Sequence, residues 1–193
     1  MARTPSTMLA LGTTAPAFSL PDFDGRMHSL EDHAAQPALL VAFICSHCPF
    51  VRHLRKEFAA FAREYAPRGL AVVAINSNDV VAYPQDGPDA MRAEAVELGY
   101  EFPYLLDESQ DVAKAYQAAC TPDFFLFDAT RRLVYRGQFD DSRPGTERPV
   151  TGADSRAAVD ALLAGRPPIA EQRPSLGCNI KWRRGQEPAY AAG

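Results

Sequence analysis

Two cysteines separated by two residues, Cys45 and Cys48, stand at a predicted junction between a strand and a helix. The run 38–44 before them is continuously apolar and has the length of a strand buried on both faces. The run 49–65 after them carries apolar residues at helical spacing, namely Phe50, Leu54, Phe58 and Phe61. The chain therefore places two thiols where a buried strand ends and an amphipathic helix begins.

This position favours thiol chemistry. A helix N-terminus presents unpaired N–H groups and a partial positive charge, and both stabilise a thiolate. The thiolate is the reactive form of cysteine. We predict that Cys45, which we expect to be the more exposed thiol, attacks a disulfide and that Cys48 resolves the mixed disulfide. A protonated His47 would further stabilise a Cys45 thiolate.

A close cysteine pair is also typical of half a metal site. His47 and His53 would then supply nitrogen ligands, and Cys120 or Cys178 a further sulfur. The sequence has no second CxxC pair, however, and its four histidines all lie at or before position 53. Inert packing of the thiols is a third interpretation. The motif favours redox chemistry, and we predict neither a metal nor an organic cofactor, since a Gly-rich phosphate loop is also missing.

The composition is that of one globular domain. The chain has 193 residues, of which 47% are hydrophobic and 23% are charged. The net charge of -4 argues against a nucleic-acid partner. The sequence shows neither a convincing secretory segment nor an apolar run long enough to cross a bilayer. We therefore expect a cytoplasmic protein with no membrane partner.

The rest of the chain predicts elements that would position the cysteine pair. We expect a loose N-terminal arm over 1–12, one domain over 13–165, and a Pro-rich tail over 166–193 that packs on the domain through Trp182. The domain would begin with a β-hairpin around Asp24-Gly25. The predicted strands are 39–44, 70–76, 102–107, 123–128 and 133–137, and the predicted helices are 49–65, 88–98, 111–119 and 153–164.

This order of elements resembles the thioredoxin superfamily, in its peroxiredoxin-like, AhpC/TSA-related branch with a CxxC motif. The match is carried by residues 43–50 around the cysteine pair, by Thr121-Pro122 before a strand, by 135–141, and by the tail segment 174–182. It covers residues 10–182. The resemblance implies an α/β fold with a central mixed sheet flanked by helices, an N-terminal β-hairpin extension and a docked C-terminal tail.

The resemblance also implies roles for residues outside the cysteine pair. The Thr121–Pro122 bond would be cis and would face the CxxC motif, and the backbone of Thr121 would pair with an extended substrate. Cys120 is either a third redox thiol or a small buried side chain. Cys178 either resolves a disulfide after the tail folds back or has a structural role. Arg136 is a candidate for a guanidinium that assists a peroxide substrate.

The sequence departs from the thioredoxin pattern in two ways. Ile44 replaces the tryptophan that precedes the first cysteine, and no acid lies between Pro37 and Ile44, so that proton transfer would use another group or water. The middle pair Ser46-His47 resembles the pairs of disulfide oxidases and isomerases. This pair suggests a less reducing couple than that of thioredoxin.

The sequence also departs from the peroxiredoxin pattern P-x-x-x-T-x-x-C. With Cys48 as its last residue, Val41 takes the place of the proline and Cys45 that of the threonine. We therefore predict a thiol–disulfide oxidoreductase that acts on protein or low-molecular-weight thiol partners. The alternative is an antioxidant thiol peroxidase that reduces hydroperoxides with Cys48 or Cys45. A redox-sensing binding module and a metal chaperone are further alternatives.

Overall fold

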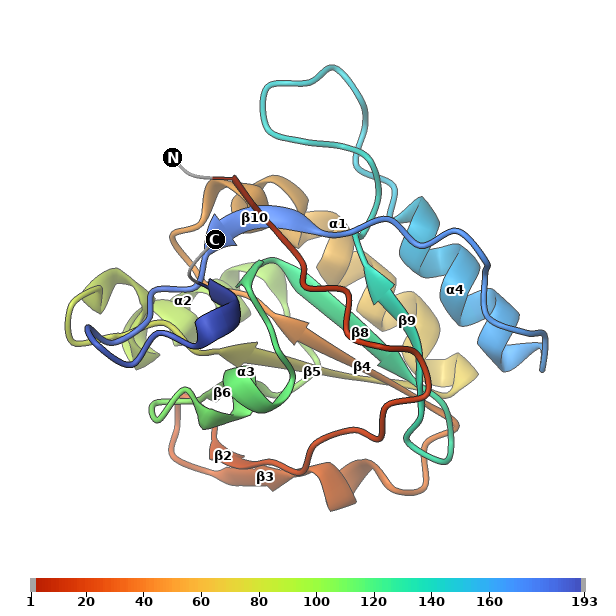
Figure 1. Cartoon of the computed structure of the whole chain (residues 1–193), viewed down its shortest axis with the longest axis horizontal. Coiled ribbons are helices and arrows are strands. Elements are labelled where there is room, and N and C mark those ends of the chain that lie inside the picture. The colour runs from red at the N-terminus through yellow and green to blue at the C-terminus, as the bar shows by residue number, and fades with distance from the viewer. Residues whose placement is uncertain (1–2, 192–193) are drawn as a thin grey trace.

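In a computed structural model of the chain, which describes residues 3–191, a five-stranded mixed sheet forms the centre of the molecule (Figure 1). Its strand order is β6-β5-β4-β8-β9. The parallel strands are β4 (Ala38–Phe43), β5 (Leu70–Asn76) and β6 (Tyr104–Leu106). β8 (Asp123–Phe127) is antiparallel to β4, and β9 (Leu133–Gly137) is antiparallel to β8.

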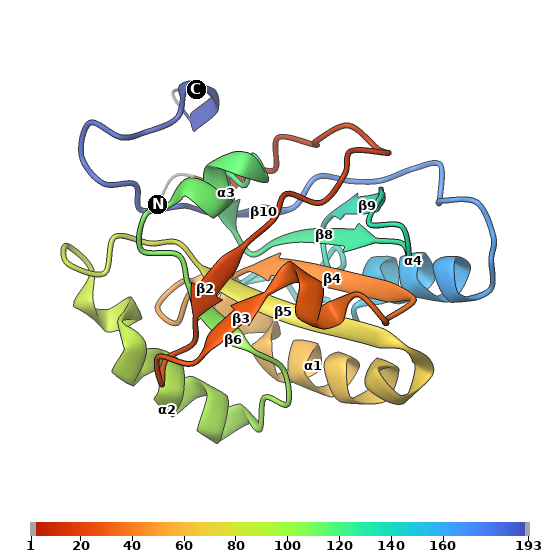
Figure 2. The ribbon, with the colours of Figure 1, turned by 90° about the horizontal axis from the view of Figure 1, so that it is seen from below.

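Two apolar layers cover the sheet, one on each face. The first core contains the buried side of α1 (Pro49–Tyr65) together with residues of α2 (Pro88–Leu98) and α4 (Ala153–Leu163). The second contains residues of α3 (Asp111–Ala115) and of β2 (Ser19–Pro21), which forms a hairpin with β3 (Met27–Ser29). Figure 2 shows that hairpin lying over the sheet on the face away from α1. Because both faces are covered, all six residues of β4 are buried.

The predicted elements agree with the structure except at some boundaries. The hairpin, the helix 49–65 and the strands 70–76 and 133–137 are confirmed. The helix expected over 111–119 ends at Ala115, and Gln117 then takes a positive φ of 52° that stops helical continuation. Short 3-10 turns complete the chain at Leu30–His33, Ala66–Arg68, Pro84–Asp86 and Ala189–Ala191.

The two ends of the chain meet in a second, three-stranded sheet. β10 (Leu176–Asn179) lies between β1 (Arg3–Pro5) and β7 (Cys120–Thr121), and both pairings are antiparallel. The arm that the sequence suggested to be loose is thus held by the tail from residue 3 onward. Residues 1, 2, 192 and 193 of the expected arm and tail lie outside the described residues.

The tail continues beyond β10 into the second core. Ile180 and Trp182 are buried there, with 1% and 8% of their surfaces exposed. The indole of Trp182 packs edge-on against Tyr190. Among the helices of residues 3–191, none is both long and apolar enough to cross a membrane.

Candidate active site

The register of the central sheet brings the two sequence motifs together. Phe43 at the end of β4 pairs with Asp123 at the start of β8, so the residues after Phe43 lie beside those before Asp123. The first group begins the CxxC turn and the second is Thr121-Pro122. The Thr121–Pro122 bond is cis, which confirms the expectation from the resemblance.

Cys45 and Cys48 both contact Thr121. The Cys45 Sγ lies 3.5 Å from the Thr121 Oγ1, and the Cys48 thiol donates to the Thr121 carbonyl oxygen at 3.1 Å. Cys48 is the N-cap residue of α1, and Pro49 takes the first helical position. Both cysteines have 0% exposed surface. The expectation that Cys45 is the more exposed of the two thiols is therefore wrong.

The Cys48 thiol donates to the Thr121 carbonyl oxygen, but other neighbouring groups form hydrogen bonds that favour its ionised form. The thiol of Cys45 makes the largest contribution, and Thr121, Cys178 and the backbone N–H of Val51 add to it. These hydrogen bonds outweigh the opposing effect of burial and lower the pKa of Cys48 to about 5. Because the N–H group belongs to the first turn of α1, the helix terminus contributes as the sequence predicted, but to the second cysteine.

The pKa of Cys45 moves in the opposite direction. Its hydrogen bond to Cys48, its burial and the nearby charge of Asp86 raise that pKa well above the ordinary thiol value. These opposite directions favour a thiolate on Cys48 and a protonated thiol on Cys45. This is the reverse of the distribution expected from the sequence, in which Cys45 carried the thiolate.

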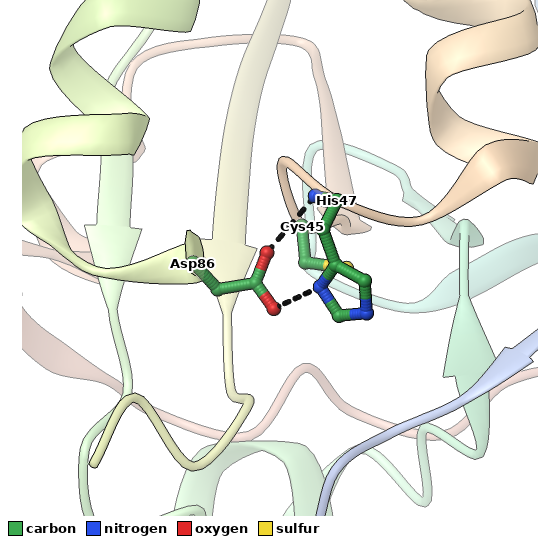
Figure 3. Close-up of side chains that lie close together, drawn as sticks. All are labelled: Cys45, His47 and Asp86. Atoms are coloured by element: carbon green, nitrogen blue, oxygen red, sulfur yellow. Dashed lines mark hydrogen bonds and ion pairs between the residues drawn. The ribbon is translucent and has the colours of Figure 1, made fainter. Parts of the chain in front are cut away.

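Asp86 is the residue at this site that the sequence analysis missed. Figure 3 shows its carboxylate facing His47, whose backbone N–H and Nδ1–H donate to it at 3.0 and 2.5 Å. The amide of Asn78 donates to the same carboxylate at 2.8 Å, and Asp86 is completely buried. The polar loop after the strand 70–76 was the available signal, because parallel strands end at the same edge of a sheet.

Within residues 3–191, Cys45, His47 and Asp86 form the one group of His, Cys, Asp and Glu side chains close enough together to hold a metal. One ligand atom of each lies within 4.8 Å of the others. Both oxygens of Asp86 already accept hydrogen bonds from protein N–H groups. In this arrangement the carboxylate fixes the imidazole in place, with Nδ1 protonated and Nε2 directed elsewhere.

The tail brings Cys178 to the same site. In the β10–β7 pairing, Cys178 is opposite Thr121 and Asn179 is opposite Cys120. Burial and the contact with Cys48 raise the pKa of Cys178 to about 12. Cys120 is fully buried, and burial likewise raises its pKa well above the ordinary value. The four cysteines all lie within residues 3–191, and none of them forms a disulfide in the structure.

Arg136 takes part in a different contact. Its Nε–H donates to the carbonyl oxygen of Leu9 at 2.7 Å, and another guanidinium N–H donates to Gln172 Oε1 at 2.6 Å. The guanidinium therefore ties the arm and the tail to β9. The structure thus directs Arg136 toward the two chain ends and away from the cysteine pair. The His53 Nε2, a candidate metal ligand in the sequence analysis, forms a hydrogen bond with the Ser142 hydroxyl at 2.7 Å.

The chain is similar in sequence and in fold to several known proteins. Residues 11–136 match the AhpC/TSA family. The thiol-disulfide oxidoreductase ResA of Geobacillus thermodenitrificans (strain NG80-2) is 29% identical over 132 residues, which cover 67% of this chain and 70% of ResA.

Two solved structures define the fold. A hypothetical protein from Sinorhizobium meliloti 1021 superimposes with a TM-score of 0.93 at 58% identity, covering 94% of this chain and 100% of that one. A thioredoxin-family thiol:disulfide interchange protein from Chlorobium tepidum TLS superimposes with a TM-score of 0.61 at 21% identity, covering 80% and 98%. The chain belongs to the AhpC/TSA family, and it is an oxidoreductase with a thioredoxin-like α/β fold.

Proposed function

We propose that the chain is a thiol–disulfide oxidoreductase in which Cys48 and Cys45 exchange disulfides with protein or low-molecular-weight thiol partners. The observation that carries this proposal is the contact between the two sulfurs at the start of α1, where hydrogen bonds lower the pKa of Cys48 to about 5. At neutral pH that thiol is almost entirely ionised. A thiolate beside a protonated thiol is the arrangement that disulfide exchange needs.

The exchange proceeds in two steps. The Cys48 thiolate attacks a substrate disulfide, forms a mixed disulfide and releases the first substrate thiolate. Cys45 then loses its proton, attacks the Cys48 sulfur and releases the second thiolate, leaving a Cys45–Cys48 disulfide. The substrate gains two electrons, and the two cysteines lose them.

Asp86 supplies what the sequence near the cysteines lacks, a buried acid. Its carboxylate and the Cys45 sulfur belong to one cluster of ligand atoms within 4.8 Å. A carboxylate at this range, directly or through one water, takes the proton that Cys45 must lose in the second step. His47 holds that carboxylate in position through two hydrogen bonds.

One observation favours a second function, the reduction of hydroperoxides. Cys48 stands at the cysteine position of the peroxiredoxin pattern, and its low pKa suits attack on a peroxide oxygen. Cys45 replaces the threonine of that pattern, however, and Arg136 is held by Leu9 and Gln172. Disulfide exchange is therefore the function that the geometry supports better.

The test measures turnover of two substrates, insulin and hydrogen peroxide. It also maps which cysteines are joined in the oxidised protein. We expect catalysed reduction of insulin by dithiothreitol, and a Cys45–Cys48 disulfide after treatment with one equivalent of glutathione disulfide. Cys120→Ser is the matched control, since Cys120 is equally buried, and it should retain full activity. Rapid loss of hydrogen peroxide without insulin reduction would replace this proposal by the peroxidase. Neither activity in a folded protein would overturn both.

A further inference from the structure

The tail strand β10 occupies the backbone edge that a substrate would use. The resemblance implied that the backbone of Thr121 pairs with an extended substrate, but in the structure it pairs with Cys178 of the same chain. The pairing is close. A Cβ atom on Gly177 would lie 2.0 Å from the Thr121 carbonyl oxygen, so only glycine fits there. The chain thus carries its own peptide in the position expected for a substrate.

The peptide is held on both sides of its cysteine. Before it, the Ser175 hydroxyl donates to the carbonyl oxygen of Pro122 at 2.5 Å. After it, the backbone N–H of Lys181 donates to the Asn78 side chain at 2.8 Å. Asn78 in turn donates to Asp86, so a chain of hydrogen bonds joins the tail to the carboxylate beside Cys45.

The thiol of Cys178 is held against the reactive sulfur. It contributes a hydrogen bond to Cys48, and the two groups shift each other's ionisation in opposite directions. Cys48 therefore contacts two thiols, Cys45 within the turn and Cys178 from the tail. Each is placed to attack Cys48 once that sulfur has entered a mixed disulfide.

We propose that Cys178 is a third exchange residue and that β10 acts as a tethered substrate, which forms a Cys48–Cys178 disulfide within one chain. This inference rests on the proposed function.

After Cys48 has formed a mixed disulfide with a substrate, the Cys178 thiol loses its proton to solvent. The resulting thiolate attacks the Cys48 sulfur, and the substrate leaves as a thiolate. Cys48 and Cys178 together lose the two electrons that the substrate disulfide gains. Attack by Cys45 on Cys48 then moves the disulfide to Cys45–Cys48 and returns Cys178 to the thiol form, with no net redox change.

The direct test uses Cys45→Ser, which removes the competing thiol. After treatment with glutathione disulfide and denaturing alkylation, peptide mapping should find a Cys48–Cys178 disulfide in most molecules. The double variant C45S/C178S should instead retain glutathione on Cys48, whereas C45S/C120S should behave like C45S. A C45S protein that keeps glutathione on Cys48, with Cys178 recovered as a thiol, would overturn the inference.

A second variant keeps every cysteine and moves the strand. Gly177→Ala places a methyl group against the Thr121 carbonyl and should displace β10. In the C45S background it should lower the yield of the Cys48–Cys178 disulfide at least several-fold, while circular dichroism shows the central fold retained. An unchanged yield would contradict the role of β10.

The two proposals can fail separately. If the unmodified protein reduces insulin but C45S forms no Cys48–Cys178 disulfide, only the role of Cys178 is lost. If the Cys48–Cys178 disulfide forms but no disulfide substrate turns over, the proposed function is wrong, and only the ability of Cys178 to form a disulfide with Cys48 is supported.

Discussion

Two segments reach the cysteine pair from opposite flanks, and they carry different chemical groups. On one flank, the loop after β5 presents Asp86, whose charge adds to the hydrogen bond with Cys48 and to burial in raising the pKa of Cys45. On the other, the tail presents Cys178, a neutral donor that favours the Cys48 thiolate. All three sulfurs are buried, with at most 4% of their surfaces exposed. Burial alone would raise every thiol pKa, so the difference shows that the neighbours decide which thiol ionises.

The largest expected effect separates the two cysteines of the turn. Cys48→Ser should slow the first, bimolecular step of disulfide exchange by about three orders of magnitude or more, because the ionised nucleophile is lost. Cys45→Ser should retain that first step and stall before the disulfide is resolved within the turn. Stopped-flow release of a chromogenic thiol measures the first step. A C45S variant as slow as C48S would reverse the assignment.

The next effect concerns Asp123, a second buried acid, which lies on the β7–β8 side of the site. Burial raises its pKa from 3.8 to about 7. The unfolded chain therefore loses this proton at lower pH than the folded chain, so folding stability falls as the pH rises from about 4 to 7. The loss amounts to about 4 kcal/mol, since one pKa unit corresponds to about 1.4 kcal/mol.

Asp123→Asn should remove this loss. Urea unfolding at pH 4.5 and pH 7.5 measures it, with the difference between the two proteins isolating Asp123 from other titrating groups. A wild-type stability that rises relative to that of D123N over this range would contradict the assignment.

A smaller effect is expected on the Asp86 flank. Asp86→Asn removes the charge that helps to raise the pKa of Cys45, so that pKa should fall. The variant also replaces one carboxylate oxygen by an NH₂ group, so that one of the buried N–H donors of His47 or Asn78 loses its acceptor. This loss should lower the free energy of unfolding by about 1–3 kcal/mol. Thiolate absorbance near 240 nm follows the first effect and urea unfolding the second. An unchanged Cys45 titration would show that Asp86 does not act on this thiol.

The smallest effect is expected on the tail flank. Cys178→Ser replaces a thiol donor by a hydroxyl donor and should shift the pKa of Cys48 by about one unit or less. Cys178→Ala, which has no donor, should raise that pKa further than C178S does. The same absorbance titration makes the comparison. If both variants and the wild type titrate identically, Cys178 does not contribute to the low pKa of Cys48.

Much of the fold could be predicted from sequence, because its signals are local. The continuous apolar run of β4 and the helical stripe of α1 specify a buried strand and the helix after it. The CxxC spacing and Thr121-Pro122 then located the reactive edge. The docking of the tail could be inferred from Trp182, since an isolated tryptophan rarely stays in solvent.

What escaped prediction depends on contacts between distant segments. Asp86 reaches the turn because Asn76 folds the loop back through a 2.7 Å hydrogen bond to the Asp86 carbonyl oxygen. The strand character of 176–179 comes from its pairing with β1 and β7, not from a local pattern. The pKa shifts of Cys45 and Cys48 depend in part on such segments, because Asp86, Thr121 and Cys178 add to the effect of the hydrogen bond between the two sulfurs. Arg136 was misplaced for the same reason.

The central claim is that Cys48 carries the thiolate. Thiolate absorbance near 240 nm, followed from pH 3.5 to 9 in the wild type, C45S, C48S and C178S, tests it without requiring any reagent to reach the buried sulfurs. We predict a step near pH 5 in the wild type, which is missing in C48S and present, shifted to higher pH, in C45S. A step near pH 5 that persists in C48S and disappears in C45S would contradict the account.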